Sequence, residues 1–450
     1  PQDAYRRGGR HPGRFHTPTI HEIAILLPDR ELPNAKRSII CQVRDPSPDT
    51  NNLQFISDGH RSYEPLSYVL LFPFGTDGHY YDMKSKAPEH KKVSVVAYTR
   101  YHMMERKDEI NILHRAGRLF QEWLCDNYER VESQRFGYLF NHQDRLRTNT
   151  RMNLMQAVTD HKVKQSGRQT LLPSSHTGSD RYLYKKREDG HAIVRYLGRP
   201  ALFITATMNT KCEEVSSMIK RDQSPYDRPD IVCRVYNAIA NSLHDDMVKN
   251  EIFGPCPAHL SSIEFQKRGA PHCHFLEWIK DFELTSRNVD CIICAEIPPE
   301  PPQNYDREKN GPSLYELVTK FMIHTCSPYC LDKNGICSKH FPHELSDETI
   351  IGEGAFVKYR RRSPAYLLLR YQSHINVECC ATVAALKYLI GYPFKGEDLT
   401  TLEISNPNDE ISTFVTKRYI SSCSAAWKIF EYSSVRMNPP VMQLPQPQLC

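Results

Sequence analysis

Apolar positions along the chain group into stretches with the spacing of strands and of helices. Residues 20–27 and 38–43 are strand-like, and the apolar run at 63–75, which turn residues end, predicts a buried strand. Apolar residues then recur at helical intervals in 93–106 and 112–128, which predicts two helices. The N-terminal third therefore combines both kinds of element.

The middle and C-terminal parts continue this mixture. Residues 202–210 alternate apolar and polar positions as a strand does, and 228–252 have the apolar spacing of a helix. Two short strands follow at 263–266 and 272–276, and the Gly- and Pro-containing turn between them predicts a hairpin. Residues 374–396 carry an apolar stripe at helical spacing, which a proline ends.

Length and composition bound the class of protein. A chain of 450 residues exceeds what one hydrophobic core serves, so we expect two or three domains. No apolar run of about 18 residues predicts a membrane span, and the polar N-terminal residues do not resemble a signal peptide. The net charge of +5 permits a nucleic-acid partner without indicating one by itself.

The cysteines bear on the compartment. There are 15 of them, an odd number, and Cys379 and Cys380 are direct neighbours in a large chain. These features favour reduced thiols over a disulfide framework. We therefore expect a reducing compartment, cytosolic or nuclear.

The hairpin carries the first candidate site. His272 and His274 are one residue apart in a strand, so both imidazoles project from the same face. The preceding strand would place Glu264 or Gln266 beside them as an oxygen ligand, and counting back across a tight turn favours Gln266. The alternative is a surface strand with two solvated histidines.

A second candidate metal site lies further along the chain. Cys326, Cys330, Cys337 and His340 follow one another within a turn-rich segment. Three thiolates and an imidazole can close a tetrahedral Zn²⁺ site. The alternative is a set of reduced structural cysteines.

Residues 356–371 combine basic and aromatic side chains without any acidic residue. Basic groups contact phosphates and flat rings stack on unpaired bases, as in a groove for single-stranded DNA. A solvated charged face with core aromatics is the alternative. The proposed DNA contacts, including the basic turn of the hairpin and one later lysine, are Lys267, Arg268, Lys358, Arg360, Arg361, Arg362, Arg370 and Lys387.

Two tyrosines complete the candidate chemistry. Tyr388 and Tyr392 are four residues apart, and on a helix they would share one face. Tyrosines at this spacing usually pack into a core. Pro393 directly after Tyr392 biases that tyrosine away from helical geometry.

These motifs together resemble one known family. The string Glu-Phe-Gln-Lys-Arg-Gly-Ala-Pro-His-Cys-His at 264–274 resembles the metal-binding motif of Helitrons, the rolling-circle transposases that carry an HUH endonuclease. Segments 64–75, 202–210, 337–342 and 374–396 resemble other family motifs in the same order. The resemblance runs from about residue 63 to 443. It departs at Gly391, where the family usually has lysine.

The resemblance implies a function. Helitron nucleases cut single-stranded DNA with two catalytic tyrosines, here Tyr388 and Tyr392, and a divalent ion, Mg²⁺ or Mn²⁺, held by His272, His274 and an oxygen ligand. Tyrosine attack gives a 5′-phosphotyrosine and a free 3′-OH. The implied partners are single-stranded DNA of transposon ends and target, and a helicase domain that full family members carry. No Gly-x4-Gly-Lys-Ser/Thr motif occurs here, so we expect no ATPase.

The resemblance also implies an architecture. We expect an α+β nuclease of HUH/Rep type at 191–435, with a central antiparallel sheet, flanking helices and a Cys-rich insertion at 326–340. Residues 1–190 would form an accessory, DNA-binding region, and 436–450 a tail leading to an absent helicase. Two other interpretations stay open: an inactive DNA-binding remnant of such a transposase, and a zinc-dependent protein-interaction module.

Overall fold

The computed structural model describes most of the central part of the chain and shorter segments at either end. The described residues are 15–16, 38–42, 53–86, 88, 90–107, 110–143, 170–265, 269–293, 295–324, 326, 330–332, 334–337, 341, 346–352, 357–360, 374–380, 399–400, 411, 414–415 and 419–442. Among them, no helix has the length and apolar character that crossing a membrane requires.

The chain folds into two compact units, between which it passes several times. Unit 1 comprises the described residues of Pro1–Tyr182, Met218–Cys233 and Glu397–Tyr432, and unit 2 those of Leu183–Ser217, Arg234–Gly396 and Ser433–Cys450. Compactness does not show what a segment does. The functional boundaries expected at residues 190 and 435 therefore stay predictions.

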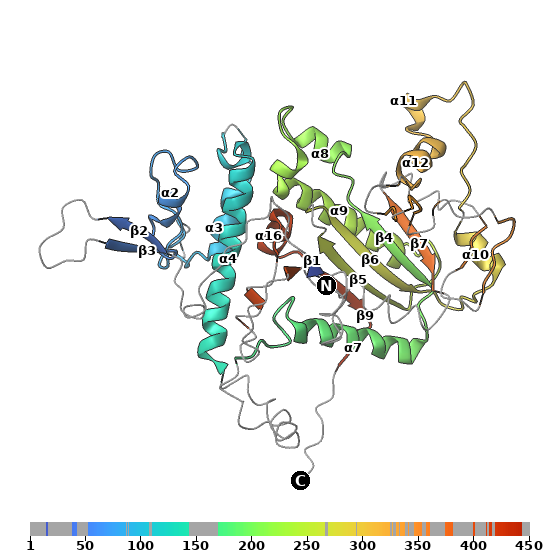
Figure 1. The fold of residues 1–450 in the computed structure, drawn as a ribbon, viewed down its shortest axis with the longest axis horizontal. Coiled ribbons are helices and arrows are strands. Elements are labelled where there is room, and N and C mark those ends of the chain that lie inside the picture. The colour runs from blue at the N-terminus through green and yellow to red at the C-terminus, as the bar shows by residue number, and fades with distance from the viewer. Residues whose placement is uncertain are drawn as a thin grey trace, which may run out of the picture. The chain divides into compact units, whose positions relative to one another are not determined.

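Unit 2 is built on a five-stranded antiparallel sheet, whose strands lie side by side in Figure 1. Its strands, from one edge to the other, are β7 (Ile375–Cys379), β4 (Leu202–Thr207), β6 (Pro271–Trp278), β5 (Ala258–Phe265) and β9 (Val435–Asn438). The predicted hairpin is the β5–β6 pair, and β6 is the central strand.

One face of this sheet is apolar and covered by helices. Leu202, Ile204 and Ala206 of β4 belong to a buried cluster with Phe275 of β6 and apolar residues of β7. Leu243 and Met247 of helix α9 (Pro229–Val248) and Val289 of α10 (Ser286–Ile292) pack against them. Successive strand residues point to opposite faces, so the other face is free for polar groups.

Further helices precede, separate or follow the strands of this sheet along the chain. They are α7 (Asp180–Leu197), α8 (Glu213–Met218), α11 (Arg307–Asn310) and α12 (Leu314–Phe321). Trp278 at the end of β6 donates its Nε1 proton to the carbonyl oxygen of Gly198, just after α7, at 2.9 Å. The expected mixed fold, with an antiparallel sheet and flanking helices, is confirmed.

Unit 1 is mainly helical. Its elements are β1 (Phe15–His16), β2 (Ser38–Gln42), β3 (Leu53–Ser57), α2 (Tyr63–Ser67), α3 (Val95–His102), η2 (Leu113–Arg115), α4 (Arg118–Asn141), η5 (Pro225–Asp227), β8 (Leu399–Thr400) and α16 (Ser422–Ile429). The helix expected at 112–128 begins later and ends later than predicted. Gly117, with φ of +54°, separates η2 from α4 in a conformation that glycine adopts most easily.

A buried carboxylate organises unit 1. Glu64 of α2 is fully buried and accepts hydrogen bonds from Arg130 Nη1 at 2.6 Å, Trp123 Nε1 at 3.0 Å and the His79 backbone N–H at 3.1 Å. Both partner side chains come from α4. The network compensates the cost of burying the charge and ties α2 to α4.

The strand predicted at 63–75 is wrong. Residues 63–67 form α2, and turns follow it. Tyr68, Leu71 and Phe72 are buried whereas Leu70 and Phe74 are 75% and 90% exposed. Burial at intervals of three and four residues fits turns and not a strand, and Pro65 is tolerated because it lies in the first helical turn.

The helical stripe predicted from 374 onward is also wrong at its start. Ile375–Cys379 is the edge strand β7, in which Ile375, Val377 and Cys379 are buried and the two residues between them half-buried. This alternation with a period of two competes with the helical stripe, and pairing with β4 decides between them. Residues 381–398, which include Tyr388 and Tyr392, lie outside the described residues.

Candidate metal centre

The polar face of the sheet places an acid and two histidines together. In the β5–β6 register, Glu264 is opposite His272, and Ser262 is opposite His274. Directly opposed residues of an antiparallel pair share one face of the sheet. His272 and His274 also share it, because they are two residues apart on β6. The hairpin thus gathers three candidate ligands by backbone geometry alone.

The three side chains meet at one carboxylate oxygen. Glu264 Oε2 lies 3.3 Å from His272 Nε2 and 3.2 Å from His274 Nε2. The two imidazole rings are 4.7 Å apart and nearly perpendicular. The side chain of Glu264 is 15% exposed, that of His272 7% and that of His274 2%. Three donors therefore point into one small and mostly buried space.

This donor set fits a divalent cation. Neighbouring ligands of an octahedral ion with bonds of the Mg²⁺ type lie about 3.0 Å apart, close to the two separations observed. One carboxylate and two neutral imidazoles leave positions for other oxygen ligands, which a catalytic ion requires. His272, His274 and Glu264 are the residues that would hold it.

A neighbouring strand orients one of the two histidines. Thr205 Oγ1 lies 3.0 Å from His274 Nδ1, and Phe203 stacks parallel to the His274 ring with 5.6 Å between centroids. When Nε2 binds a cation, Nδ1 has to carry the proton and would donate it to Thr205 Oγ1. His272 Nδ1 is buried without a partner among the described residues, so His274 is the better-fixed ligand.

Cys273, between the histidines, is excluded from this space. It faces the opposite side of the sheet by alternation and is buried. Burial raises the pKa of its thiol to about 12, so it stays protonated at neutral pH. The His-Cys-His sequence therefore supplies two ligands and not three.

Thr205 was not among the residues that the sequence motifs identified as functional, although strand alternation places it on the polar face. We expect Thr205→Val to weaken binding of Mn²⁺ by about 10- to 100-fold, because the hydrogen bond that orients His274 is lost. Metal titration of the purified protein measures this. Thr207→Val is the matched control, since Thr207 lies on the same strand and face but makes no hydrogen bond to either histidine within the described residues. Equal affinities of the two variants would contradict the role of Thr205.

Other predicted site residues are described only in part. Gln266, Lys267 and Arg268 lie outside the described residues, as do both tyrosines, Arg361, Arg362, Arg370 and Lys387. Lys358 is exposed and pairs with Ile350 in an isolated bridge. Arg360 forms a 3.9 Å ion pair with Glu296. Their role as DNA contacts stays a prediction.

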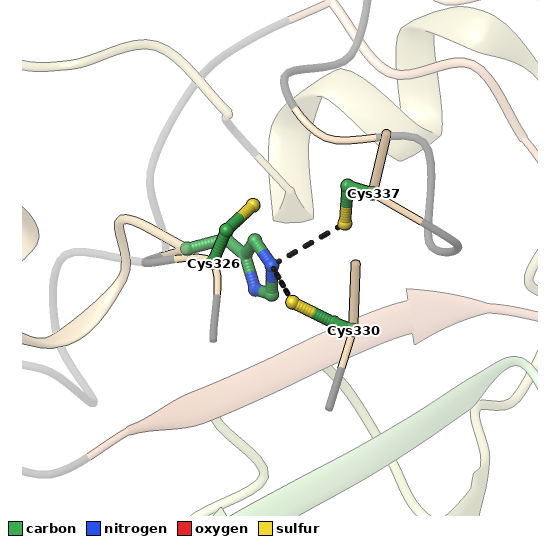
Figure 2. A group of neighbouring side chains, drawn as sticks. Cys326, Cys330 and Cys337 are labelled. Carbon is green, nitrogen blue, oxygen red and sulfur yellow. Dashed lines mark hydrogen bonds between the residues drawn. The ribbon is translucent and has the colours of Figure 1, made fainter. Parts of the chain in front are cut away.

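The predicted cysteine site gathers around a histidine that the sequence analysis missed. Cys326, Cys330 and Cys337 surround the imidazole of His324, and these ligand atoms all lie within 4.8 Å of one another. Figure 2 shows the three cysteines around one ring. His340 lies outside the described residues. His324 stands two residues before Cys326, so a search extended N-terminally would have included it.

Comparison with known proteins bears on the first site. A search of curated proteins gave no match. Residues 98–277 match the family model described as "Helitron helicase-like domain at N-terminus". The matched segment contains β4, β5 and nearly all of β6, and so Glu264, His272 and His274. The cysteine cluster and the two tyrosines lie beyond it. Over these residues the chain is therefore similar to the N-terminal helicase-like domain of Helitron proteins, which supports a Helitron-related transposase.

Proposed function

We propose that this chain is a metal-dependent endonuclease and strand transferase for single-stranded DNA, acting in a Helitron-type rolling-circle transposition. The observation that carries the proposal is the mostly buried cluster of Glu264, His272 and His274 on the polar face of the sheet, inside the segment that matches the family. The HUH/Rep-type assignment of the fold is part of the same proposal.

The ligands suit such a reaction. A divalent ion, Mg²⁺ or Mn²⁺, would polarise the scissile phosphate and offset its charge. Glu264 and the two histidines would hold this ion. Thr205 would fix the tautomer of His274 through the hydrogen bond between its Oγ1 and His274 Nδ1. Their placement on the three inner strands β4, β6 and β5 makes the arrangement rigid.

The covalent step belongs to the tyrosines. The hydroxyl oxygen of Tyr388 or Tyr392 attacks phosphorus and forms a phosphotyrosine at the 5′ end of the cut strand. The bond to the 3′ oxygen breaks, and that oxygen leaves as a 3′-OH after taking up a proton. A second attack would transfer the strand to a new end.

The partners follow from the same chemistry. Single-stranded DNA of transposon ends and target is the proposed substrate, with Lys358 and Arg360 among the phosphate contacts. A helicase domain in the same polypeptide would supply unwound strand. A protein acting on transposon DNA would work in the nucleus, after passage through the cytoplasm.

A nicking assay tests the proposal. The chain is incubated with end-labelled single-stranded DNA and Mn²⁺, and products are separated under denaturing conditions. With a 5′ label we expect shortened DNA, and with a 3′ label a labelled protein band that resists denaturation. Both products should be lost with EDTA and absent with fully duplex DNA. Binding of single-stranded DNA without cutting or adduct would contradict the enzyme and favour the inactive remnant.

A further inference from the structure

The segment between β6 and β7 has little hydrophobic core of its own. Among its described residues from 295 to 360, the buried apolar side chains are Leu317, Val318, Cys330, Cys337 and Val357. Two of these five are cysteines of the cluster. Segments that bury so little apolar surface are commonly stabilised by a disulfide or a metal ion. The described cysteines form no disulfide.

A tight turn places two of the cysteines side by side. Leu331 and Cys337 pair in an antiparallel bridge, and Asp332 closes the turn between them. Asp332 Oδ1 accepts hydrogen bonds from the backbone N–H groups of Asn334 and Ile336, each at 2.8 Å. Gly335 has φ of +76°, which glycine adopts without strain. The turn therefore fixes Cys330 and Cys337 through local bonds.

The imidazole of His324 supplies a fourth donor atom. Its Nε2 lies 3.6 Å from Cys330 Sγ and 3.5 Å from Cys337 Sγ, the two dashed contacts in Figure 2. In a tetrahedral zinc site, bonds of the usual lengths put a nitrogen and a sulfur ligand about 3.6 Å apart. The spacing is that of two ligands of one zinc ion.

Hydrogen bonds between these groups do not account for the cluster. A neutral imidazole has one lone pair in the ring plane, so Nε2 can accept from one thiol and not from two. A third thiol, Cys326, lies in the same group, and all four ligand atoms fall within 4.8 Å of one another. A cation at their centre satisfies every donor at once.

The imidazole is also held in place from its other side. Phe341 stacks on the His324 ring, with 4.3 Å between centroids and 19° between planes. Helix α12, which ends three residues before His324, begins at a capping box formed by Ser313 and Glu316. Stacking on Phe341 thus holds the ring in addition to the contacts that its Nε2 makes with the sulfurs.

We propose that His324, Cys326, Cys330 and Cys337 bind one structural Zn²⁺ ion, with His324 and not His340 as the fourth ligand. Three thiolates and one imidazole close a tetrahedral shell and leave no position for a substrate, as in structural zinc sites. The ion holds the segment between β6 and β7 together. The proposal is independent of the nuclease function.

Metal analysis of the intact purified chain tests the site. After extensive dialysis against metal-free buffer, which removes weakly held ions, we expect about one zinc per chain to remain. The His272→Ala, His274→Ala double variant should keep it, because its lost ligands belong to the other cluster. His340→Ala and Cys291→Ser should also keep it, the latter because Cys291 is an exposed cysteine outside the cluster.

Variants of the fourth ligand decide its identity. His324→Ala should weaken zinc binding by about 100-fold or more, whereas His324→Cys, which restores a fourth ligand, should retain the ion. The cobalt-substituted protein gives a second readout, since the intense visible bands of a tetrahedral thiolate site should shift in His324→Cys. This variant keeps the test valid if His324→Ala fails to fold.

Several results would overturn the proposal. A folded wild-type chain that holds no zinc would leave these residues as ordinary cysteines and a histidine. Zinc retained by His324→Ala but lost from His340→Ala would give the fourth position to His340. Loss of zinc from the double histidine variant of the sheet would place the ion there.

Discussion

Alanine at both His272 and His274 is expected to lower the rate of single-strand nicking by about 10³-fold or more. A bound cation contributes several kcal/mol to stabilising charge at a phosphate, and about 4 kcal/mol corresponds to this factor. Both imidazoles face the same carboxylate oxygen, so removing them leaves only Glu264 of the three proposed ligands. The initial rate in saturating Mn²⁺ measures the effect.

The two single variants, His272→Ala and His274→Ala, should differ in how much metal affinity they lose. His274 is fixed by Thr205 and Phe203, whereas His272 Nδ1 lacks a partner among the described residues. His274→Ala should therefore lose more metal affinity than His272→Ala, and a higher Mn²⁺ concentration should restore His272→Ala more fully. Metal titrations of both variants, followed through the nicking rate, separate lost binding from lost chemistry.

A serine on the same face provides the control. Ser262 is opposite His274, and its buried hydroxyl has no hydrogen-bond partner among the described residues. Ser262→Ala changes the same patch without removing a ligand, so nicking should stay within about twofold of wild type. If the double histidine variant cut DNA at the rate of Ser262→Ala, the metal centre would lie elsewhere.

The oxygen ligand, Glu264 or Gln266, shows what strand alternation and turn length can predict and what they cannot. Alternation places His272 and His274 on one face, and the structure has them there. The oxygen ligand depends on the register, and counting across a tight turn favours Gln266. The observed pairing ends at Phe265 and Pro271, so five residues connect the strands and Glu264 is opposite His272. Comparing Glu264→Ala with Gln266→Ala in the metal titration tests the choice.

Contacts between distant segments are what the sequence alone does not predict. Thr205 precedes His274 by 69 residues, and only the pairing of β4 with β6 brings them together. The buried Glu64 meets Arg130 across 66 residues, which turns an apolar run that resembles a strand into a short helix and turns. In each case a long-range partner decides among local alternatives that are close in energy.

His324 illustrates a different limit. The cysteine spacing predicts a zinc site, but it does not choose between two histidines that flank the cysteines on opposite sides. The turn around Asp332 and the stacking on Phe341 bring His324 to the sulfurs. Ligand identity depends here on the path of the loop, which short motifs do not encode.

Substitution of the two tyrosines is the second change for which we expect a large effect on cleavage, and the expectation is argued from the residues beside them in the sequence. A single nucleophile suffices for one cut, whereas moving a strand to a new site needs a second transesterification. Tyr388 follows Lys387, whose ammonium group would stabilise a phenolate or a nearby phosphate. Tyr392 stands between Gly391 and Pro393, which disfavour regular helix and predict a more loosely held hydroxyl.

We therefore expect Tyr388→Phe to lower the first cleavage by about 10³-fold or more, because the attacking oxygen is lost. Tyr392→Phe should leave substantial nicking and impair strand transfer, and the double variant should form no covalent adduct. Peptide mapping of the adduct trapped on wild-type protein identifies the nucleophile. DNA found only on Tyr392 would reverse the order of attack, and DNA on neither tyrosine would remove both from the reaction while leaving the metal centre untouched.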